Sequence, residues 1–131
     1  MKVAFASSDG DHIDEHFGKA TAFHIWEVEP SGAHCVGRLG QPDRGGDDED
    51  HILAKATALE GCSIACSVQI GGPAAAKLVA RHIHPMKTDA VVPIKDMVEK
   101  LQNVLRGSAP PWLAKTMGIV PARRLVQDLE E

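Results

Sequence analysis

The chain begins with a short apolar run and a long polar loop, which together read Val3-Ala4-Phe5-Ala6-Ser7-Ser8-Asp9-Gly10-Asp11-His12-Ile13-Asp14-Glu15-His16-Phe17-Gly18. The apolar run predicts a first strand that is buried on both faces. The loop holds four carboxylates and two histidines, with glycines towards both ends. A loop of this polarity after the first strand of an α/β protein is a common place for a binding site. The alternative is a solvated turn, in which Asp and Gly serve turn geometry alone.

The composition predicts one soluble domain. The chain has 131 residues, 44% of them hydrophobic, which suffices for a single core. The formal net charge is -4 and only 4% of the residues are aromatic, which argues against a nucleic-acid-binding surface. Three cysteines without a signal-like N-terminus indicate reduced thiols, and no stretch approaches the length of a membrane helix. We therefore expect a cytoplasmic protein.

Apolar periodicity predicts five strands and three helices in the order β-β-β-α-β-α-β-α. Runs rich in strand-forming residues predict the strands, at residues 2–7, 21–29, 33–39, 62–70 and 83–88. Helical spacing predicts three helices. The first follows the acidic run 47–50, and the other two span residues 74–82 and 94–106.

This order predicts an α/β fold with a mixed five-stranded sheet. The turn Pro30-Ser31-Gly32 makes the second and third strands an antiparallel hairpin. The fourth and fifth strands are joined through a helix, so we expect them to be parallel, with helices covering both faces of the sheet. The core pattern is complete at Arg106. We therefore expect a domain over residues 1–107 and an extension over 108–131, which either docks as a helix or orders on binding.

The end of the polar loop, His16-Phe17-Gly18, is suited to presenting a side chain. If Phe17 enters the core and Gly18 turns the backbone, His16 projects from an anchored point. A neutral imidazole is the commonest metal ligand in proteins. His12 stands four residues earlier and is a second candidate metal ligand. The alternative for both residues is an exposed loop histidine.

Further candidates lie around the fourth predicted strand. Cys62 and Cys66 do not have the spacing of a zinc site, which favours two core thiols. Cys66 is closer to the C-terminal rim of the sheet, where α/β proteins bind ligands. We therefore expect Cys66 to be partly reachable and Cys62 to be enclosed. Gly71-Gly72 and Pro73 precede a helix, and free backbone amides at a helix start attract anions.

Three segments together resemble the dinitrogenase iron-molybdenum cofactor biosynthesis family: the first strand with its SSDG loop, DEHFGKATAFHIWEVE over residues 14–29, and CSIACSVQIGGPAAAKLVARHIHPMK over residues 62–87. The likeness covers residues 1–106. It implies a ribonuclease H-like fold and a protein that is not an enzyme. Such a protein binds an iron-sulfur cofactor precursor, or the finished iron-molybdenum cofactor, and carries it between assembly proteins. The resemblance places cofactor binding at His16 and indicates Cys66 as a second candidate.

The implied cargo suggests the remaining site residues. Iron-sulfur clusters carry negative charge, so nearby cations and free amides favour binding, and Lys19, Lys77 and Gly71-Gly72 are candidates. One or two labile ligands hold such a cluster and still permit onward transfer. The partners implied are the nitrogenase cofactor assembly proteins that donate and receive the cluster, with no nucleic acid and no membrane.

Two other functions are compatible with parts of the sequence. The first is a metal-dependent nuclease of ribonuclease H-like fold, whose carboxylates would be Asp9, Asp11, Asp14 and Glu15. A two-metal nuclease needs carboxylates that converge from rigid strands, whereas these crowd one loop. The second is a regulatory protein that binds simple metal ions through His12 and His16.

Overall fold

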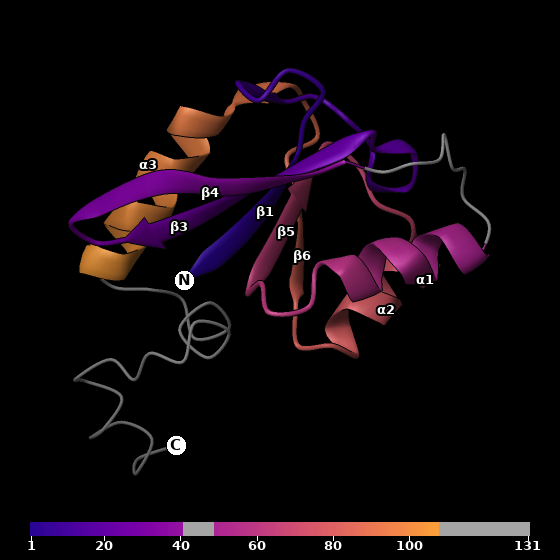
Figure 1. Ribbon diagram of the computed structural model, residues 1–131. Coiled ribbons are helices and arrows are strands. Elements are labelled where there is room, and N and C mark those ends of the chain that lie inside the picture. The colour runs from indigo at the N-terminus through magenta and orange to yellow at the C-terminus, as the bar shows by residue number, and fades with distance from the viewer. Residues whose placement is uncertain (41–48, 108–131) are drawn as a thin grey trace, which may run out of the picture.

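Strands and helices follow one another closely in the computed structural model, which describes residues 1–40 and 49–107 (Figure 1). The elements are β1 Lys2–Ala6, β2 His12–Ile13, the 3-10 helix η1 Phe17–Lys19, β3 Ala22–Glu29, β4 Gly32–Gly40, α1 Glu49–Ala58, β5 Ile64–Ser67, α2 Gly72–Val79, β6 His84–Lys87, β7 Val92–Pro93 and α3 Ile94–Arg106. Residues 41–48 and the predicted extension 108–131 lie outside the described residues.

A five-stranded sheet with the order β4-β3-β1-β5-β6 forms the centre of the fold. β1 pairs antiparallel with β3 and parallel with β5, and β5 pairs parallel with β6. β3 and β4 form the predicted antiparallel hairpin. The prediction of a mixed sheet of five strands is therefore confirmed. α1 and α2 pack on one face of the sheet and α3 packs on the other (Figure 1).

Apolar side chains form one cluster on each face of the sheet, because successive residues of a strand point to opposite faces. In β1, Val3 and Phe5 face α3, whereas Ala4 and Ala6 face α1 and α2. All four side chains are fully buried, as the sequence predicts for a strand covered on both sides. The predicted apolar stripe of α3 lies in the α3-side cluster, and it comprises Ile94, Met97, Val98, Leu101, Val104 and Leu105.

The sequence does not predict the short elements β2, η1 and β7. Strands of two residues are too short for an apolar period to be visible. β2 and β7 pair antiparallel, and the Ile94 N–H donates to the Asp11 carbonyl at 2.8 Å. This pairing ties the first loop to the start of α3.

The fourth strand is shorter than predicted and spans Ile64–Ser67 instead of residues 62–70. The Cys62 N–H donates to the Leu59 carbonyl at 3.0 Å, so Cys62 belongs to the turn after α1. The predicted strand over residues 62–70 would place Cys62 and Cys66 on one face, and this part of the prediction is therefore wrong. Cys62 lies in the cluster under α1 and α2, and Cys66 lies in the cluster under α3.

His24 and His34 lie on the two predicted hairpin strands, residues 21–29 and 33–39, and could pair across them, but the structure does not pair them. The turn at Pro30-Ser31 sets the register, and His34 lies opposite Glu27 while His24 lies opposite Arg38. The two histidines are therefore not cross-strand neighbours.

We expect Leu101→Ala to lower the free energy of unfolding by about 2–5 kcal/mol, because it leaves a cavity between α3 and the sheet. Leu101 is only 3% exposed. Glu99→Ala on the exposed side of α3 is the control, with an expected change within about 0.5 kcal/mol. Denaturant unfolding measures both, and equal effects of the two substitutions would contradict the packing of α3.

Candidate functional site

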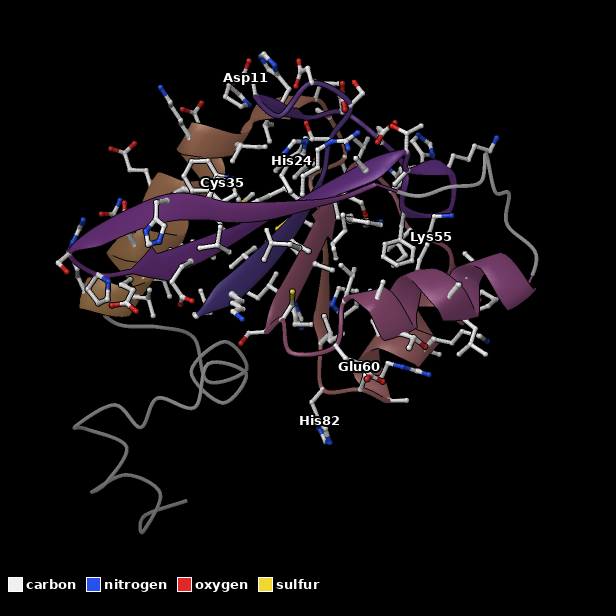
Figure 2. All side chains as sticks on the ribbon, in the orientation of Figure 1. Asp11, His24, Cys35, Lys55, Glu60 and His82 are labelled. Carbon is white, nitrogen blue, oxygen red and sulfur yellow. The ribbon has the colours of Figure 1, made fainter. Side chains whose placement is uncertain are left out.

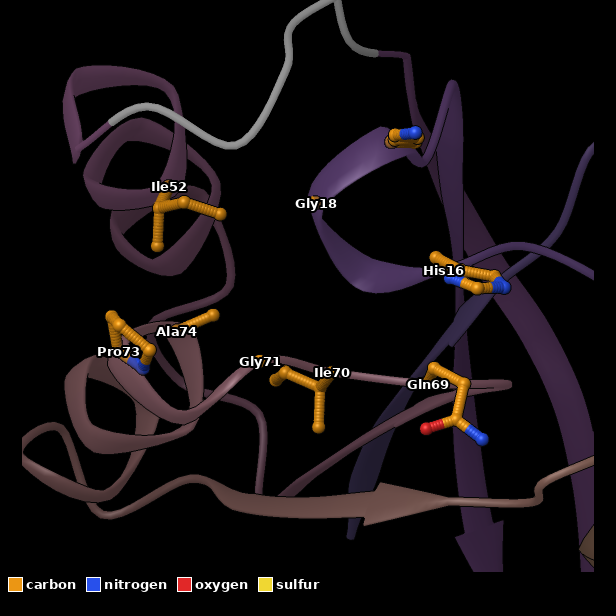
Figure 3. A pocket seen from close by; sticks show the side chains of 9 residues that line it. His16, Gly18, Ile52, Gln69, Ile70, Gly71, Pro73 and Ala74 are labelled. Atoms are coloured by element: carbon orange, nitrogen blue, oxygen red, sulfur yellow. The ribbon is translucent and has the colours of Figure 1, made fainter.

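A pocket of about 490 Å³ opens where the first loop meets the segment after β5 (Figure 3). Its walls come from the first loop with η1, from α1, and from the chain between β5 and α2. The lining residues are His16, Gly18, Lys19, Ile52, Gln69, Ile70, Gly71, Pro73 and Ala74. Three of the residues that the sequence proposes, His16, Lys19 and Gly71, thus lie together in one cavity, and Gly72 follows directly as the first residue of α2.

His16 is held at this pocket by its two neighbours. The Val68 N–H donates to the Glu15 carbonyl at 2.9 Å, and the Phe17 N–H donates to the Gln69 carbonyl at 2.9 Å. Phe17 is 1% exposed, and its ring centroid lies 5.3 Å from that of Phe23. His16 itself is exposed. The predicted arrangement, with an anchoring phenylalanine beside a projecting histidine, is therefore confirmed.

The start of α2 offers backbone donors to the same pocket. Gly71 precedes the helix in an extended conformation, and no side chain caps this helix end. Pro73 has no N–H, so the donors of the first turn are those of Gly72 and Ala74. The helix dipole adds partial positive charge here, and exposed Lys19 lines the pocket from η1. Lys77 lies in the last turn of α2 and does not line the pocket.

Three of the four loop carboxylates hold the loop in shape. Asp9 accepts from the N–H groups of Asp11 and His12 at 2.7 and 2.9 Å. Asp14 accepts from the Ser8 N–H and hydroxyl at 2.9 and 2.6 Å. Glu15 likewise accepts from the N–H and hydroxyl of Thr21, both at 2.9 Å. Within the described residues, no three His, Cys, Asp or Glu side chains gather to hold a metal ion. The convergent carboxylates that a two-metal nuclease needs are therefore not found in this part of the chain.

Gly10 lets this loop lie close to the sheet. It has a φ of +82°, and a Cβ at this position would lie 3.1 Å from the Cε1 atom of His24. His24 sits beneath the first loop (Figure 2). Its pKa is lowered, mainly because burial penalises the charged imidazolium. A glycine is therefore needed here both for its backbone conformation and for space.

His12 lies in a different cavity from His16. This second cavity has a volume of about 270 Å³, and its lining includes His12, Trp26 and Lys95. The Nδ1 atom of His12 is 3.1 Å from the Asp9 carboxylate. The structure therefore does not bring the two candidate metal-ligating histidines into one pocket.

Cys66 is also separated from the pocket, and the expectation that it is partly reachable is wrong. Its side chain is 0% exposed and packs on the α3 side of the sheet, with Sγ 4.0 Å from the Sδ atom of Met86. The pocket lies on the face covered by α1 and α2. Burial raises the pKa of the Cys66 thiol to about 12. Cys62 is enclosed as expected, with 8% exposure, and burial raises the pKa of its thiol as well.

Sequence reasoning missed Gln69 and Ile70, which form the wall of the pocket beside His16. Cys66 was a candidate because it is close to the C-terminal rim of β5. Gln69 and Ile70 come just after the end of β5, so closeness to this rim indicates them more directly than it indicates Cys66, which lies within the strand.

The fold places the pocket at the carboxyl ends of β1 and β5, the usual position of ligand sites in α/β proteins.

Residues 1–104 match the family model described as dinitrogenase iron-molybdenum cofactor. The chain belongs to this family, as the sequence predicted.

Named relatives cover most of the chain. It is 37% identical over 125 residues to Protein NifY of Azotobacter vinelandii, with 95% of this chain and 51% of that protein covered. It is 35% identical to Protein NifX of Rhodobacter capsulatus, covering 100% of this chain and 86% of that protein. Protein NifX of Herbaspirillum seropedicae is 40% identical, with coverage of 89% and 82% respectively. The chain thus spans about half the length of the NifY relative and most of the NifX relatives.

The fold also matches the solved crystal structure of PH0822, with a TM-score of 0.64 over 79% of this chain and 91% of that chain. At 18% sequence identity this likeness supports the fold alone. No helix in the described part of the chain is long and apolar enough to cross a membrane.

We expect Asp9→Asn to lower the free energy of unfolding at neutral pH, because an amide oxygen accepts hydrogen bonds more weakly than a carboxylate. The backbone N–H groups of Asp11 and His12 hold the pKa of Asp9 well below its usual range. The ionised Asp9 carboxylate therefore stabilises the folded state fully above its unfolded-state pKa of about 3.9. This stabilisation is lost as the pH falls towards the folded-state pKa.

Denaturant unfolding of wild type and Asp9→Asn at pH 7 and in steps towards pH 2 measures this difference. Asp11→Asn is the control, since the Asp11 carboxylate accepts no hydrogen bond from the described residues. If the difference in free energy of unfolding between wild type and Asp9→Asn stayed constant across the acid range, the Asp9 charge would not stabilise the loop.

We expect thiol reagents to modify exposed Cys35 in the native protein long before Cys66. Figure 2 shows Cys35 on the outer hairpin, whereas Cys66 is fully enclosed. With a pKa of about 12, Cys66 has almost no reactive thiolate near neutral pH. Mass spectrometry after timed alkylation measures the order, and Cys35→Ser should remove the fast phase. Rapid native modification of Cys66 would contradict its burial.

Proposed function

We propose that this chain binds an iron-sulfur nitrogenase cofactor, or its precursor, and carries it during assembly of the iron-molybdenum cofactor. The observation that carries the proposal is the pocket in which His16, Lys19 and the start of α2 meet. Membership of the dinitrogenase iron-molybdenum cofactor family and the NifX and NifY relatives support it.

The chemistry of the pocket fits a cargo of this kind. The imidazole of His16 is a ligand for iron, and the Lys19 ammonium and the amides that begin α2 complement a negatively charged cluster. Ile52 and Ile70 give the pocket an apolar wall. A single protein ligand at an exposed position exchanges readily, which a carrier needs and a permanent cofactor site does not.

In this proposal the chain is a carrier and not an enzyme, and its site residues are His16, Lys19, Gly71 and Gly72. Its partners are the cofactor assembly proteins that donate and accept the cluster, in the cytoplasm. The relatives include FeMo cofactor biosynthesis protein NifB of Azotobacter vinelandii, 33% identical over 102 residues, which covers 73% of this chain and 20% of that protein. We further propose that the sheet is ribonuclease H-like, with the cofactor-binding domain over residues 1–107 and an extension over 108–131.

We expect His16→Ala to weaken binding of a [4Fe–4S] cluster by at least about tenfold, or 1.4 kcal/mol, because the substitution removes the imidazole ligand. The free energy of unfolding should change by no more than about 0.5 kcal/mol, since His16 is exposed. Anaerobic titration followed by the cluster absorption measures affinity, and His12→Ala is the matched control in the neighbouring cavity.

Phe17→Ala tests whether Phe17 anchors the loop, as distinct from the role of His16 as the ligand of the cluster. It should cost about 3–5 kcal/mol of stability, because the ring is buried against the core, with cluster binding lost as a consequence. Unchanged affinity in His16→Ala, or a loss only in His12→Ala, would refute the assignment of His16.

A further inference from the structure

Gln69 is the polar residue of the pocket wall that lies next to His16 without any role assigned so far (Figure 3). Its main chain is fixed from two sides. The Gln69 carbonyl accepts from the Phe17 N–H at 2.9 Å and from the Ser67 hydroxyl at 3.1 Å. The backbone hydrogen bond that positions His16 therefore also positions Gln69.

The side chain of Gln69 is oriented by Asp89. The Nε2 atom of Gln69 donates to the Oδ1 atom of Asp89 at 2.8 Å. A carboxylate only accepts hydrogen bonds, so Asp89 selects the amide orientation in which Nε2 faces it. This leaves the side-chain oxygen Oε1 on the other side. In Figure 3 the oxygen of Gln69 lies towards Ile70 and the nitrogen lies away from it.

Asp89 is itself held in an unusual backbone conformation. Its φ is +63°, in the left-handed region, which Asp tolerates better than most residues. The Asp89 N–H donates to the Val68 carbonyl at 3.0 Å, and the Lys87 ammonium lies 3.7 Å from its carboxylate. Asp89 is thus tied to the residue that precedes Gln69, which keeps the two side chains within reach of each other.

We propose that Gln69 contacts the cargo and that Asp89, as a positioning residue, directs the Gln69 Oε1 acceptor at it. The inference rests on the proposed function and adds specificity to it. The pocket then prefers a cluster that carries a hydrogen-bond donor, such as a hydroxyl group, near the iron that His16 binds. The other groups of the site, Lys19 and the amides of α2, recognise negative charge and do not make this distinction.

Two synthetic [4Fe–4S] clusters test the preference, one capped by 2-hydroxyethanethiolate and one by 2-methoxyethanethiolate. The hydroxyl donates and accepts hydrogen bonds, whereas the ether oxygen only accepts. In both cases the His16 imidazole replaces one thiolate, which takes a proton from water and leaves as the thiol. We expect wild type to bind the hydroxyl-bearing cluster about fivefold more tightly, as for one net neutral hydrogen bond.

Variants of the two residues locate the origin of the preference. Gln69→Leu should bind both clusters equally. Asp89→Asn keeps the shape of the side chain, but its amide can either accept from Gln69 Nε2 or donate to Gln69 Oε1. The Gln69 amide is then no longer held in one orientation, so the preference for the hydroxyl should fall. Asp89→Gly suits the positive φ and frees the amide, so the preference should fall part of the way. Adding Asp89→Gly to Gln69→Leu should change nothing further, because Asp89 acts through Gln69.

The side-chain amide of Gln69 gives a readout without any cluster. Its NH₂ resonances should shift and exchange faster with solvent in Asp89→Gly than in wild type, and unchanged resonances would overturn the role of Asp89. Equal preference for the hydroxyl cluster in wild type and Gln69→Leu would overturn the role of Gln69 while leaving a His16-dependent carrier intact. Failure of wild type to bind either cluster would overturn the proposed function and this inference with it.

Discussion

Two backbone hydrogen bonds, one on each side of His16, join the first loop to the segment that follows β5. Glu15 and Phe17 belong to a loop that leaves β1, whereas Val68 and Gln69 follow a strand that pairs with β1 in parallel. Parallel pairing brings the carboxyl ends of both strands to one edge of the sheet, so the two segments meet there. Without these bonds the histidine would sit on an unsupported loop, and the pocket would lose the contact between two of its walls.

The acidic residues of the first loop also serve this constraint. Asp14 accepts hydrogen bonds from the backbone N–H and the hydroxyl of Ser8, and Glu15 accepts the same two from Thr21. Each pair is six residues apart in the sequence. Asp9 organises the turn at Asp11 and His12. A cluster of carboxylates that resembles a metal site in the sequence thus acts as a set of backbone acceptors. The loop stays defined although Ser8, Asp9, Asp11 and His12 are exposed, and it leaves His16 as the projecting side chain.

The sequence was sufficient to predict the sheet, its helices and the anchored histidine, because each depends on local pattern. Val3 and Phe5 alternate with alanines in a strand buried on both faces, and the α3 stripe follows the helical period. The same reasoning failed where a turn shifts the pattern. Cys62 and Cys66 would share one face only if β5 began at Cys62 instead of Ile64. The turn after α1, which includes Cys62, prevents this. The orientation of the Gln69 side chain depends on Asp89, a contact twenty residues away that no local pattern reveals.

The pocket is assembled from parts of the chain that are far apart in sequence. His16 comes from the first loop, Ile52 from α1, and Gln69 and Gly71 from beyond β5. No single element of the fold holds all of these walls, so the site exists only while these segments are folded together. Occupancy of the pocket and global folding are thereby thermodynamically linked, and any ligand bound there lowers the population of the unfolded chain. A protein built in this way is most vulnerable to proteolysis when the pocket is empty, which couples its lifetime to the occupancy of the pocket.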